Sequence, residues 1–293
     1  MSYQRILLAL IATLTIISCA KQSRHNSPPA IKVTYDSSVP QKERELVELD
    51  LKTLHWATPS DVPGKSILGL SEISRDSLSG WLQKRFRYVI GVNYEYEKLL
   101  TAKKISDQDY HKMIFSKISE TGSLMLNLGA VIYSLAEQTS PSRLSVMQIQ
   151  NQSVVIDSPR VGVILIDEIY KFHDEIEGLR GNIESLVNSI LRLSIFFHEA
   201  RHSDGNGDNA GFPHVECDSG DFEGDFSCDD SSNGANSVGK VLLQSLISSC
   251  SDCNENEKMK IQLWISDLSL RVNSNAIEKD PRAERKSKRE FEG

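Results

Sequence analysis

One short segment in the second half of the chain combines side chains that can bind a metal and move a proton. His198 and His202 are four residues apart, so on a helix both imidazoles project from one face and can hold one Zn²⁺ at about 2.1 Å. Glu199 directly follows His198, which places its carboxylate beside such a metal instead of on it. There the carboxylate can accept a proton from a water molecule that the metal polarises. The spacing predicts a zinc site with a general base next to it.

The five residues from His198 to His202 read His-Glu-Ala-Arg-His and match the HExxH motif, which resembles that of zincin metallopeptidases. The resemblance covers roughly residues 161–214. It implies a zinc-dependent hydrolase that cleaves peptide bonds in a peptide or protein substrate, with Glu199 activating a zinc-bound water. The alternative is a non-catalytic envelope lipoprotein, in which the segment holds a structural metal or no metal.

A third protein ligand is needed, and two residues compete for the position. Residues 198–208 fit the pattern HExxHxxGxxD, which resembles the snapalysin variant of the metzincin signature and implies Asp208 as a ligand. Metzincins also need a methionine beneath the zinc, and the only downstream methionine, Met259, lies in a polar helical stretch. His214 is the chemically better ligand, and its longer spacing resembles zincins whose third ligand comes from a loop after the helix. Both His214 and Asp208 stay candidates.

The same segment contains a D-x-N-x-D run made of Asp204, Asn206 and Asp208, which is typical of the start of a calcium loop. The sixth position of that loop is not glycine, and the twelfth is Val215, so an EF-hand is excluded. A looser Ca²⁺ site that stabilises the loop remains as a second metal hypothesis.

The first residues of the chain predict export. Arg5 precedes an apolar run, residues 6–17, that is too short to span a bilayer as a helix and is typical of a secretory signal peptide. Residues 16–19, Ile-Ile-Ser-Cys, resemble the bacterial lipobox, which implies cleavage before Cys19 and a lipid anchor on its sulfur. By the sorting rule of that class, Ala20 after the cysteine implies the outer membrane instead of the inner one.

The other cysteines agree with an oxidising compartment. Beyond Cys19 there are four, an even number that favours disulfide bonds over a zinc site, because the pairs lack a matched C-x-x-C spacing. Three pairings are possible, and proximity along the chain favours Cys217 with Cys228 and Cys250 with Cys253.

Composition and charge predict a single exported globular domain. The chain has 33 Lys and Arg against 40 Asp and Glu, so its net charge of −7 disfavours nucleic acid as a partner. We expect a signal peptide at residues 1–18, a flexible tether at 19–40, one domain at 41–277 and a disordered charged tail at 278–293. Nothing in the sequence indicates more than a monomer whose membrane contact is its lipid anchor.

The elements around the motif predict an α+β fold, in which a helix-dominated zincin-like domain contains a small mixed sheet. Residues 182–202 form the longest periodic helix, with the motif at its C-terminal end and one buried apolar stripe. The uniformly apolar run at 161–166 predicts a buried strand, and resembles the strand that pairs with extended substrates in zincins. The other helices are expected at 41–56, 77–87, 123–138, 236–248 and 255–272, and the other strands at 88–96 and 146–156.

Overall fold

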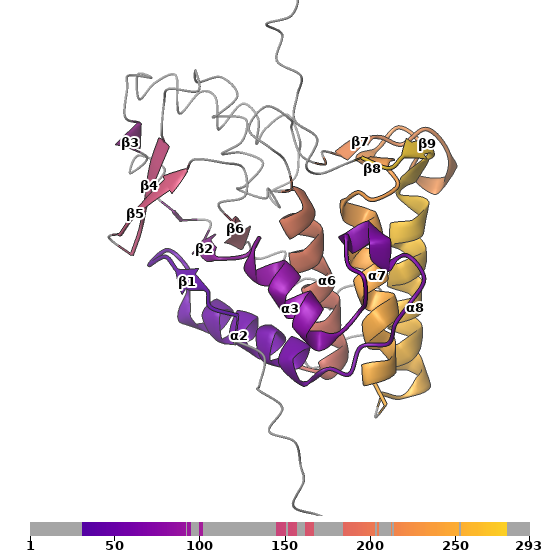
Figure 1. Cartoon of the computed structure of the whole chain (residues 1–293), viewed down its shortest axis with the longest axis horizontal. Coiled ribbons are helices and arrows are strands. Elements are labelled where there is room, and N and C mark those ends of the chain that lie inside the picture. The colour runs from indigo at the N-terminus through magenta and orange to yellow at the C-terminus, as the bar shows by residue number, and fades with distance from the viewer. Residues whose placement is uncertain are drawn as a thin grey trace, which may run out of the picture. The chain divides into compact units, whose positions relative to one another are not determined.

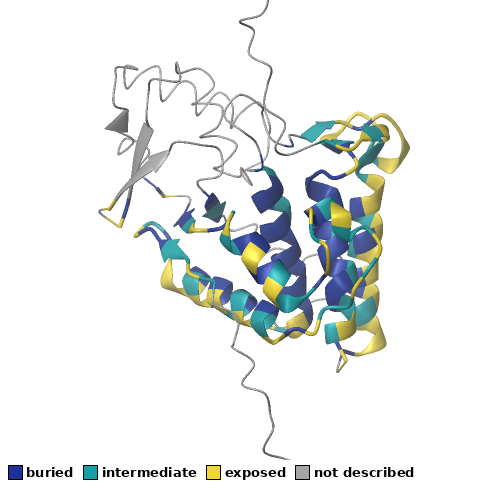
Figure 2. Ribbon diagram, viewed as in Figure 1, coloured by how far each residue is buried: buried dark blue, intermediate teal, exposed yellow. Residues whose placement is uncertain are grey.

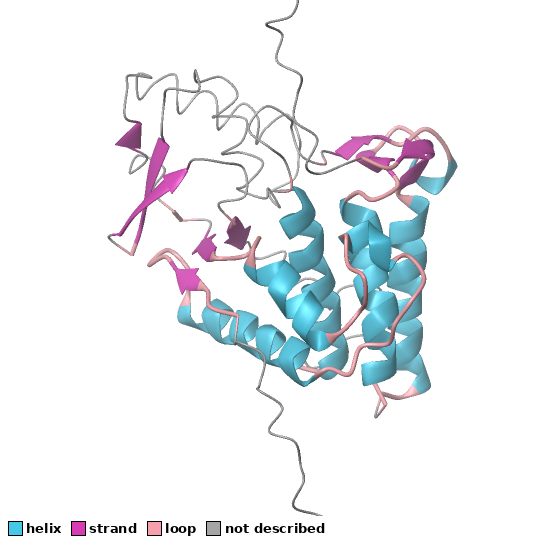
Figure 3. Cartoon of the chain, viewed as in Figure 1, coloured by secondary structure: helices cyan, strands magenta, loops and turns pink. Residues whose placement is uncertain are grey.

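The computed structural model describes residues 31–91, 93–94, 100–101, 145–150, 152–156, 162–166, 184–202, 204, 212, 214–251 and 253–279. These residues form the expected α+β fold, with helices and strands placed as in Figures 1 and 3. The helices are α2 (Gln41–Trp56), α3 (Arg75–Gln83), α6 (Leu186–His202), α7 (Ala235–Leu246) and α8 (Glu255–Leu270). The strands are β1 (Thr34–Tyr35), β2 (Tyr88–Gly91), β3 (Leu100–Thr101), β4 (Ser145–Ile149), β5 (Gln152–Ile156), β6 (Val163–Ile166), β7 (His214–Glu216), β8 (Phe226–Ser231) and β9 (Val272–Ile277).

Helix boundaries follow the capping residues. Helix α2 has the bounds that its leucine spacing predicts. Helix α3 begins earlier than expected, because Ser74 accepts a hydrogen bond from the Ser77 amide in a capping box, and it also ends earlier, at Gln83. Helix α8 begins after Asn254, which forms the same kind of box with Glu257.

Helix α6 is the centre of the helical part and is buried on nearly every side (Figure 2). It packs against α2 and α3 as well as α7 and α8, so the single buried stripe expected from the sequence was too narrow. The physical reason is that apolar periodicity misses polar side chains that are buried in pairs. Arg192, for example, donates from Nη2 and Nε to the two carboxylate oxygens of Asp50, at 2.8 and 2.9 Å, and both residues are buried.

Helices α6 and α7 come into close contact at Gly239 of α7. A Cβ atom at this position would lie 3.4 Å from the Ser194 carbonyl oxygen and 3.8 Å from the Cβ of His198, both on α6. Helix α7 therefore packs closely at this position against the turn of α6 that carries the metal-binding motif. Helix α8 packs against both α6 and α7, and Figure 1 shows the three helices side by side.

Instead of one small mixed sheet, the described strands form three sheets of three strands each. Strands β1, β2 and β6 are parallel, with Val89 opposite Ile164. Strands β3, β4 and β5 are antiparallel, so the run at 146–156 is a hairpin turning at Gln150, whose φ is 50°. Sheet β7-β8-β9 is mixed and lies at one end of α7 and α8 (Figure 1).

Strand β2 ends at Gly91, earlier than the expected strand at 88–96. A Cβ atom at Gly91 would lie within 2.2 Å of the Ser38 carbonyl oxygen, so the chain leaving β1 passes directly over this residue. Strand β1 itself lies within the segment expected to be a tether, where Thr34 pairs with Tyr88. Lys279, expected in the tail, pairs with Asp230 at 2.8 Å.

Several expectations fall outside the described residues. These are the signal peptide, Cys19 and most of the tether, the helix at 123–138, Asn206, Asp208 and the tail from residue 280 onward. Among the described residues, no helix combines the length and the apolar character that crossing a membrane requires.

Candidate metal centre

Three histidines from two elements, α6 and β7, bring their Nε2 atoms together. His198 and His202 lie in the last turns of α6, and His214 is the first residue of β7. The Nε2 atom of His198 lies 3.2 Å from that of His202 and 3.1 Å from that of His214. Nitrogen ligands at about 2.1 Å from a tetrahedral zinc ion are about 3.4 Å apart, which is close to these separations. The group could therefore hold a metal ion.

The α6 histidines are each oriented by a backbone hydrogen bond. His202 donates from Nδ1 to the carbonyl oxygen of Phe212, because a carbonyl can only accept. His198 is hydrogen-bonded to the backbone of Ala235, the first residue of α7. A proton held on Nδ1 leaves the Nε2 lone pair free to bind a metal, so the Phe212 contact selects the ligand tautomer of His202.

His214 is oriented by a carboxylate. Its Nδ1 atom lies 3.3 Å from Oδ1 of Asp229, which is 1% exposed on the neighbouring strand β8. The two residues are direct partners in the β7–β8 register. A carboxylate behind a ligand histidine is the usual outer support of a zinc site, and here it has the same effect as the Phe212 carbonyl behind His202.

The electrostatic surroundings keep the α6 histidines neutral. Burial lowers the pKa of His198 well below its ordinary value, and the neighbouring His202, His214 and Arg271 lower it further. Burial, followed by the proximity of His214, lowers the pKa of His202 to about 3. Neutral imidazole is the form that binds a metal, so both residues are in their ligand state at neutral pH.

Glu199 lies between the two α6 ligands in the sequence and is buried, with 6% of its surface exposed. Burial holds the carboxylate in an environment with little bulk water. The expected general base is therefore part of the protein interior next to the His198 ligand.

Arg201, inside the motif, is buried and contacts three residues that lie beyond the end of α6. It donates from Nε to the Asn233 carbonyl at 2.8 Å and from Nη1 to Asp204 Oδ2 at 3.0 Å. Its guanidinium also stacks on the Phe212 ring, with its Cζ 3.9 Å from the centroid. Because the Phe212 carbonyl orients His202, Arg201 supports a ligand without touching the metal position.

Asp204 is bound by two arginines. Its Oδ2 accepts from Arg85 Nε at 2.8 Å as well as from Arg201, and its side chain is fully buried. This pairing opposes the calcium hypothesis at Asp204, because its charge is already neutralised inside the protein.

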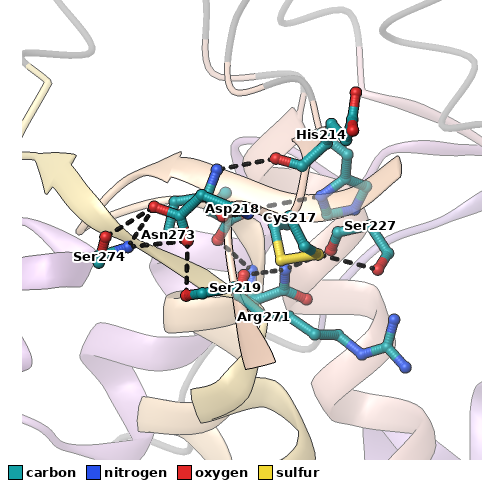
Figure 4. Close-up of a disulfide and its surroundings, with 12 residues drawn as sticks. His214, Cys217, Asp218, Ser219, Ser227, Arg271, Asn273 and Ser274 are labelled. Atoms are coloured by element: carbon teal, nitrogen blue, oxygen red, sulfur yellow. Dashed lines mark hydrogen bonds and ion pairs between the residues drawn. A yellow bond between two sulfur atoms is a disulfide. The ribbon is translucent and has the colours of Figure 1, made fainter. Parts of the chain in front are cut away.

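A disulfide bond closes the hairpin that carries His214. Cys217 and Cys228 are bonded as proximity predicted, one residue beyond β7 and one residue before Asp229 respectively. Figure 4 shows His214 close to this disulfide, and Asp218 beyond it bonded to β9. The carboxylate of Asp218 accepts from the Ser274 hydroxyl at 2.7 Å, so the loop is tied to β9 as well. The second expected disulfide, Cys250–Cys253, precedes α8.

The structure brings three of the expected site residues, His198, His202 and His214, together, and it describes no position for Asp208. Glu199 follows His198 in α6 and is buried. Sequence reasoning did not assign Phe212, Ala235 or Asp229 to the site. The first two act through backbone atoms, which carry no signal in residue type. Asp229 had only a weak signal, a carboxylate that precedes a glycine and a helix.

Comparisons with protein-family models, with curated proteins and with solved structures found no match for this chain. What the site can do must therefore be worked out from its own residues.

Proposed function

We propose that this protein is a zinc-dependent peptidase that uses Glu199 as its general base. The observation that carries the proposal is the convergence of three imidazole Nε2 atoms, with separations of 3.1 and 3.2 Å from His198, next to a buried glutamate. In addition, the Nδ1 atoms of His202 and His214 face acceptor oxygens, which a chance cluster of histidines would not need.

The donor set favours zinc. Three neutral nitrogen ligands suit Zn²⁺ and are a poor match for Ca²⁺ or Mg²⁺, which prefer oxygen. A set of three protein ligands leaves a fourth position open, as catalytic zinc sites require. Zinc held there supplies Lewis-acid polarisation of a carbonyl group and of water.

The chain's own residues supply the proton transfers and the geometry. The Glu199 carboxylate accepts the proton of the attacking water molecule and passes it to the nitrogen of the leaving amine. The contacts of Phe212 and Asp229 keep the histidine lone pairs directed inward. Arg201 holds the end of α6 at a constant distance from Phe212.

The test compares Glu199→Gln with Glu216→Gln in the purified full chain. Glu216 lies two residues from His214 on β7 and its side chain is exposed, so it controls for the loss of one negative charge near the site. Zinc content is measured by mass spectrometry, and hydrolysis with a fluorescent casein substrate. We expect one zinc per chain in all three proteins and a loss of hydrolysis of about 10²- to 10⁴-fold in Glu199→Gln alone.

Three outcomes would contradict the proposal. A wild-type chain that takes up no zinc excludes the metal site. Zinc binding with equal hydrolysis by wild type and Glu199→Gln excludes the role of Glu199. Zinc binding without hydrolysis of any protein substrate would leave a structural metal site in an envelope protein.

We further propose that a lipid on Cys19 anchors the protein to the outer membrane. The lipobox-like residues 16–19 support this location, and the Cys217–Cys228 and Cys250–Cys253 disulfides agree with an oxidising compartment. Metabolic labelling with a fatty acid should mark the wild type and leave Cys19→Ser unlabelled. Labelling that persists in Cys19→Ser would rule out this anchor.

A further inference from the structure

Asp229 lies at a junction that serves two elements at once. One of its carboxylate oxygens, Oδ2, accepts from the backbone N–H of Asn236, in the first turn of α7, at 2.8 Å. The residue at the N-cap position of α7 is Gly234, which has no side chain to cap the helix. Asp229, on the preceding strand, therefore caps the N-terminus of α7 in place of an N-cap side chain.

Gly234 makes room for this carboxylate. A Cβ atom at Gly234 would lie 2.4 Å from Oδ2 of Asp229, closer than any non-bonded contact allows. In the turn between β8 and α7, the Asp229 carboxylate thus occupies the space that the side chain of an N-cap residue would take.

The other oxygen of Asp229 faces the metal centre. Oδ1 lies 3.3 Å from Nδ1 of His214 in an ion-pair contact, and neither atom makes a hydrogen bond within the part of the chain described. A carboxylate oxygen accepts, so this contact favours the tautomer in which His214 carries its proton on Nδ1. The lone pair of His214 then lies on Nε2, which is 3.1 Å from His198 Nε2.

The helix that Asp229 caps also contacts another ligand. Its first residue, Ala235, is hydrogen-bonded through its backbone to His198, and Gly239 one turn later packs against the Cβ of the same histidine. The start of α7 is therefore the outer support of His198, while Asp229 is that of His214.

We propose that Asp229 is the positioning residue of the metal centre: Oδ2 fixes the start of α7 behind His198, and Oδ1 selects the metal-binding tautomer of His214. The proposal rests on the proposed zinc function and deepens it by identifying what selects the third ligand. Asp229 does not touch the metal or the substrate.

Asp229→Asn separates the two tasks. The backbone N–H of Asn236 needs an acceptor, so the single amide oxygen of the variant turns toward α7 and its NH₂ group faces His214. That NH₂ group donates to Nδ1 and drives the imidazole proton to Nε2, where it blocks the metal. Helix capping survives, while the tautomer of His214 that binds a metal becomes the less stable one.

The control is Asp230→Asn. Asp230 is the next residue on β8, is half exposed, and pairs with Lys279 on the surface. This variant makes the same change of charge one residue away. The described partner of the Asp230 carboxylate is Lys279, which is not one of the three histidines.

Two readouts test the proposal on the full chain. The nitrogen chemical shifts of His214 in the zinc-free protein report its tautomer, and competition with a chromophoric chelator reports the zinc affinity. We expect the Nδ1–H tautomer in wild type and Asp230→Asn, and the Nε2–H tautomer in Asp229→Asn. We also expect the zinc affinity of Asp229→Asn to fall about 10- to 100-fold, the usual effect of losing an outer-shell partner.

The results can separate this proposal from the proposed function. An Asp229→Asn protein that keeps the Nδ1–H tautomer and binds zinc as tightly as wild type overturns the positioning role. A wild-type chain with no zinc affinity overturns the metal function, while its tautomer measurement still tests Asp229. Should Asp229→Asn fail to fold, an Nε2–H tautomer at His214 in zinc-free wild type would overturn the proposal alone.

Discussion

The end of α6 and the β7–β8 hairpin contribute to the same candidate metal centre in different ways. The helix supplies His198 and His202 by spacing alone, and any helix over these residues would place them on one face. The hairpin supplies His214 only because β7 is paired with β8, closed by a disulfide, and tied to β9. Local geometry thus makes two of the ligands, whereas long-range contacts must hold the third in place.

The two regions also differ in what surrounds them. The helix end is buried among arginines and apolar side chains, and Arg201 and Asp204 are each 1% exposed. The hairpin is mostly at the surface, with Phe226 73% exposed. Damage to the helix end should therefore destabilise the fold, while damage to the hairpin should mainly weaken the metal site.

The largest effect is expected from Arg201→Leu at the helix end. Removing the guanidinium takes one of two cations from the buried Asp204 and leaves the Asn233 carbonyl without this hydrogen bond. Together these losses should lower the free energy of unfolding by about 3–5 kcal/mol. Urea denaturation measures the loss. Arg271→Leu is the matched control, because its pair with Asp267 is partly exposed and is expected to contribute at most about 1 kcal/mol. Equal losses in the two variants would show that burial at Arg201 does not matter.

The next prediction compares the loss of the Cys217–Cys228 disulfide in the hairpin with the loss of Cys250–Cys253. Replacing Cys217 and Cys228 by serine opens a loop with a sequence separation of 11, which should cost about 2–3 kcal/mol. Zinc affinity should fall as well, because His214 lies on the opened hairpin. The double replacement of Cys250 and Cys253, separated by 3, should cost less and leave the zinc affinity as it was. Zinc binding that is insensitive to the first pair would mean that strand pairing alone holds His214.

A third effect tests the turn after the hairpin. The Cβ of Gly234→Ala overlaps Oδ2 of Asp229, so the variant should lose about 1–3 kcal/mol of stability and bind zinc less tightly. Gly224→Ala is a control elsewhere in the hairpin, because nothing lies within 4 Å of a Cβ there, although its φ of 89° adds some backbone strain. Thermal unfolding with and without zinc measures both. A Gly234→Ala protein with wild-type zinc affinity would separate the turn from the metal site.

A further effect concerns protons at the helix end and needs the zinc-free protein. Because burial lowers the pKa of His198 and His202 in the folded state, the unfolded chain binds more protons as the pH falls below about 6.5. The zinc-free protein should therefore lose stability on acidification below about pH 6.5, by about 1 kcal/mol per pH unit for each histidine. The contribution of His202 should continue down to about pH 3. Urea midpoints in a chelator at pH 7 and pH 5 measure this loss, and His202→Asn should reduce it. A pH-independent midpoint in wild type would contradict neutral, buried histidines.

The predicted bounds of helices were most accurate where a regular apolar spacing or a single capping residue fixes the end of the helix. The bounds of α2 follow from its leucines, and the start of α8 at Glu255 was as expected. The pairing of both disulfides followed from proximity in the chain. The separation of the strands into three sheets did not follow, because which strands pair depends on partners far away in the sequence.

The HExxH spacing by itself predicted two candidate metal ligands and a candidate general base beside them, because a helix of 3.6 residues per turn gives His198 and His202 one face. Residue types also made His214 a candidate, but they favoured it only slightly over Asp208. Only the tertiary structure placed the Nε2 atom of His214 within 3.1 Å of His198 and put Asp229 behind it. The reason is that β7 and β8 meet through hydrogen bonds between backbones, and such contacts between distant segments are not encoded in local spacing.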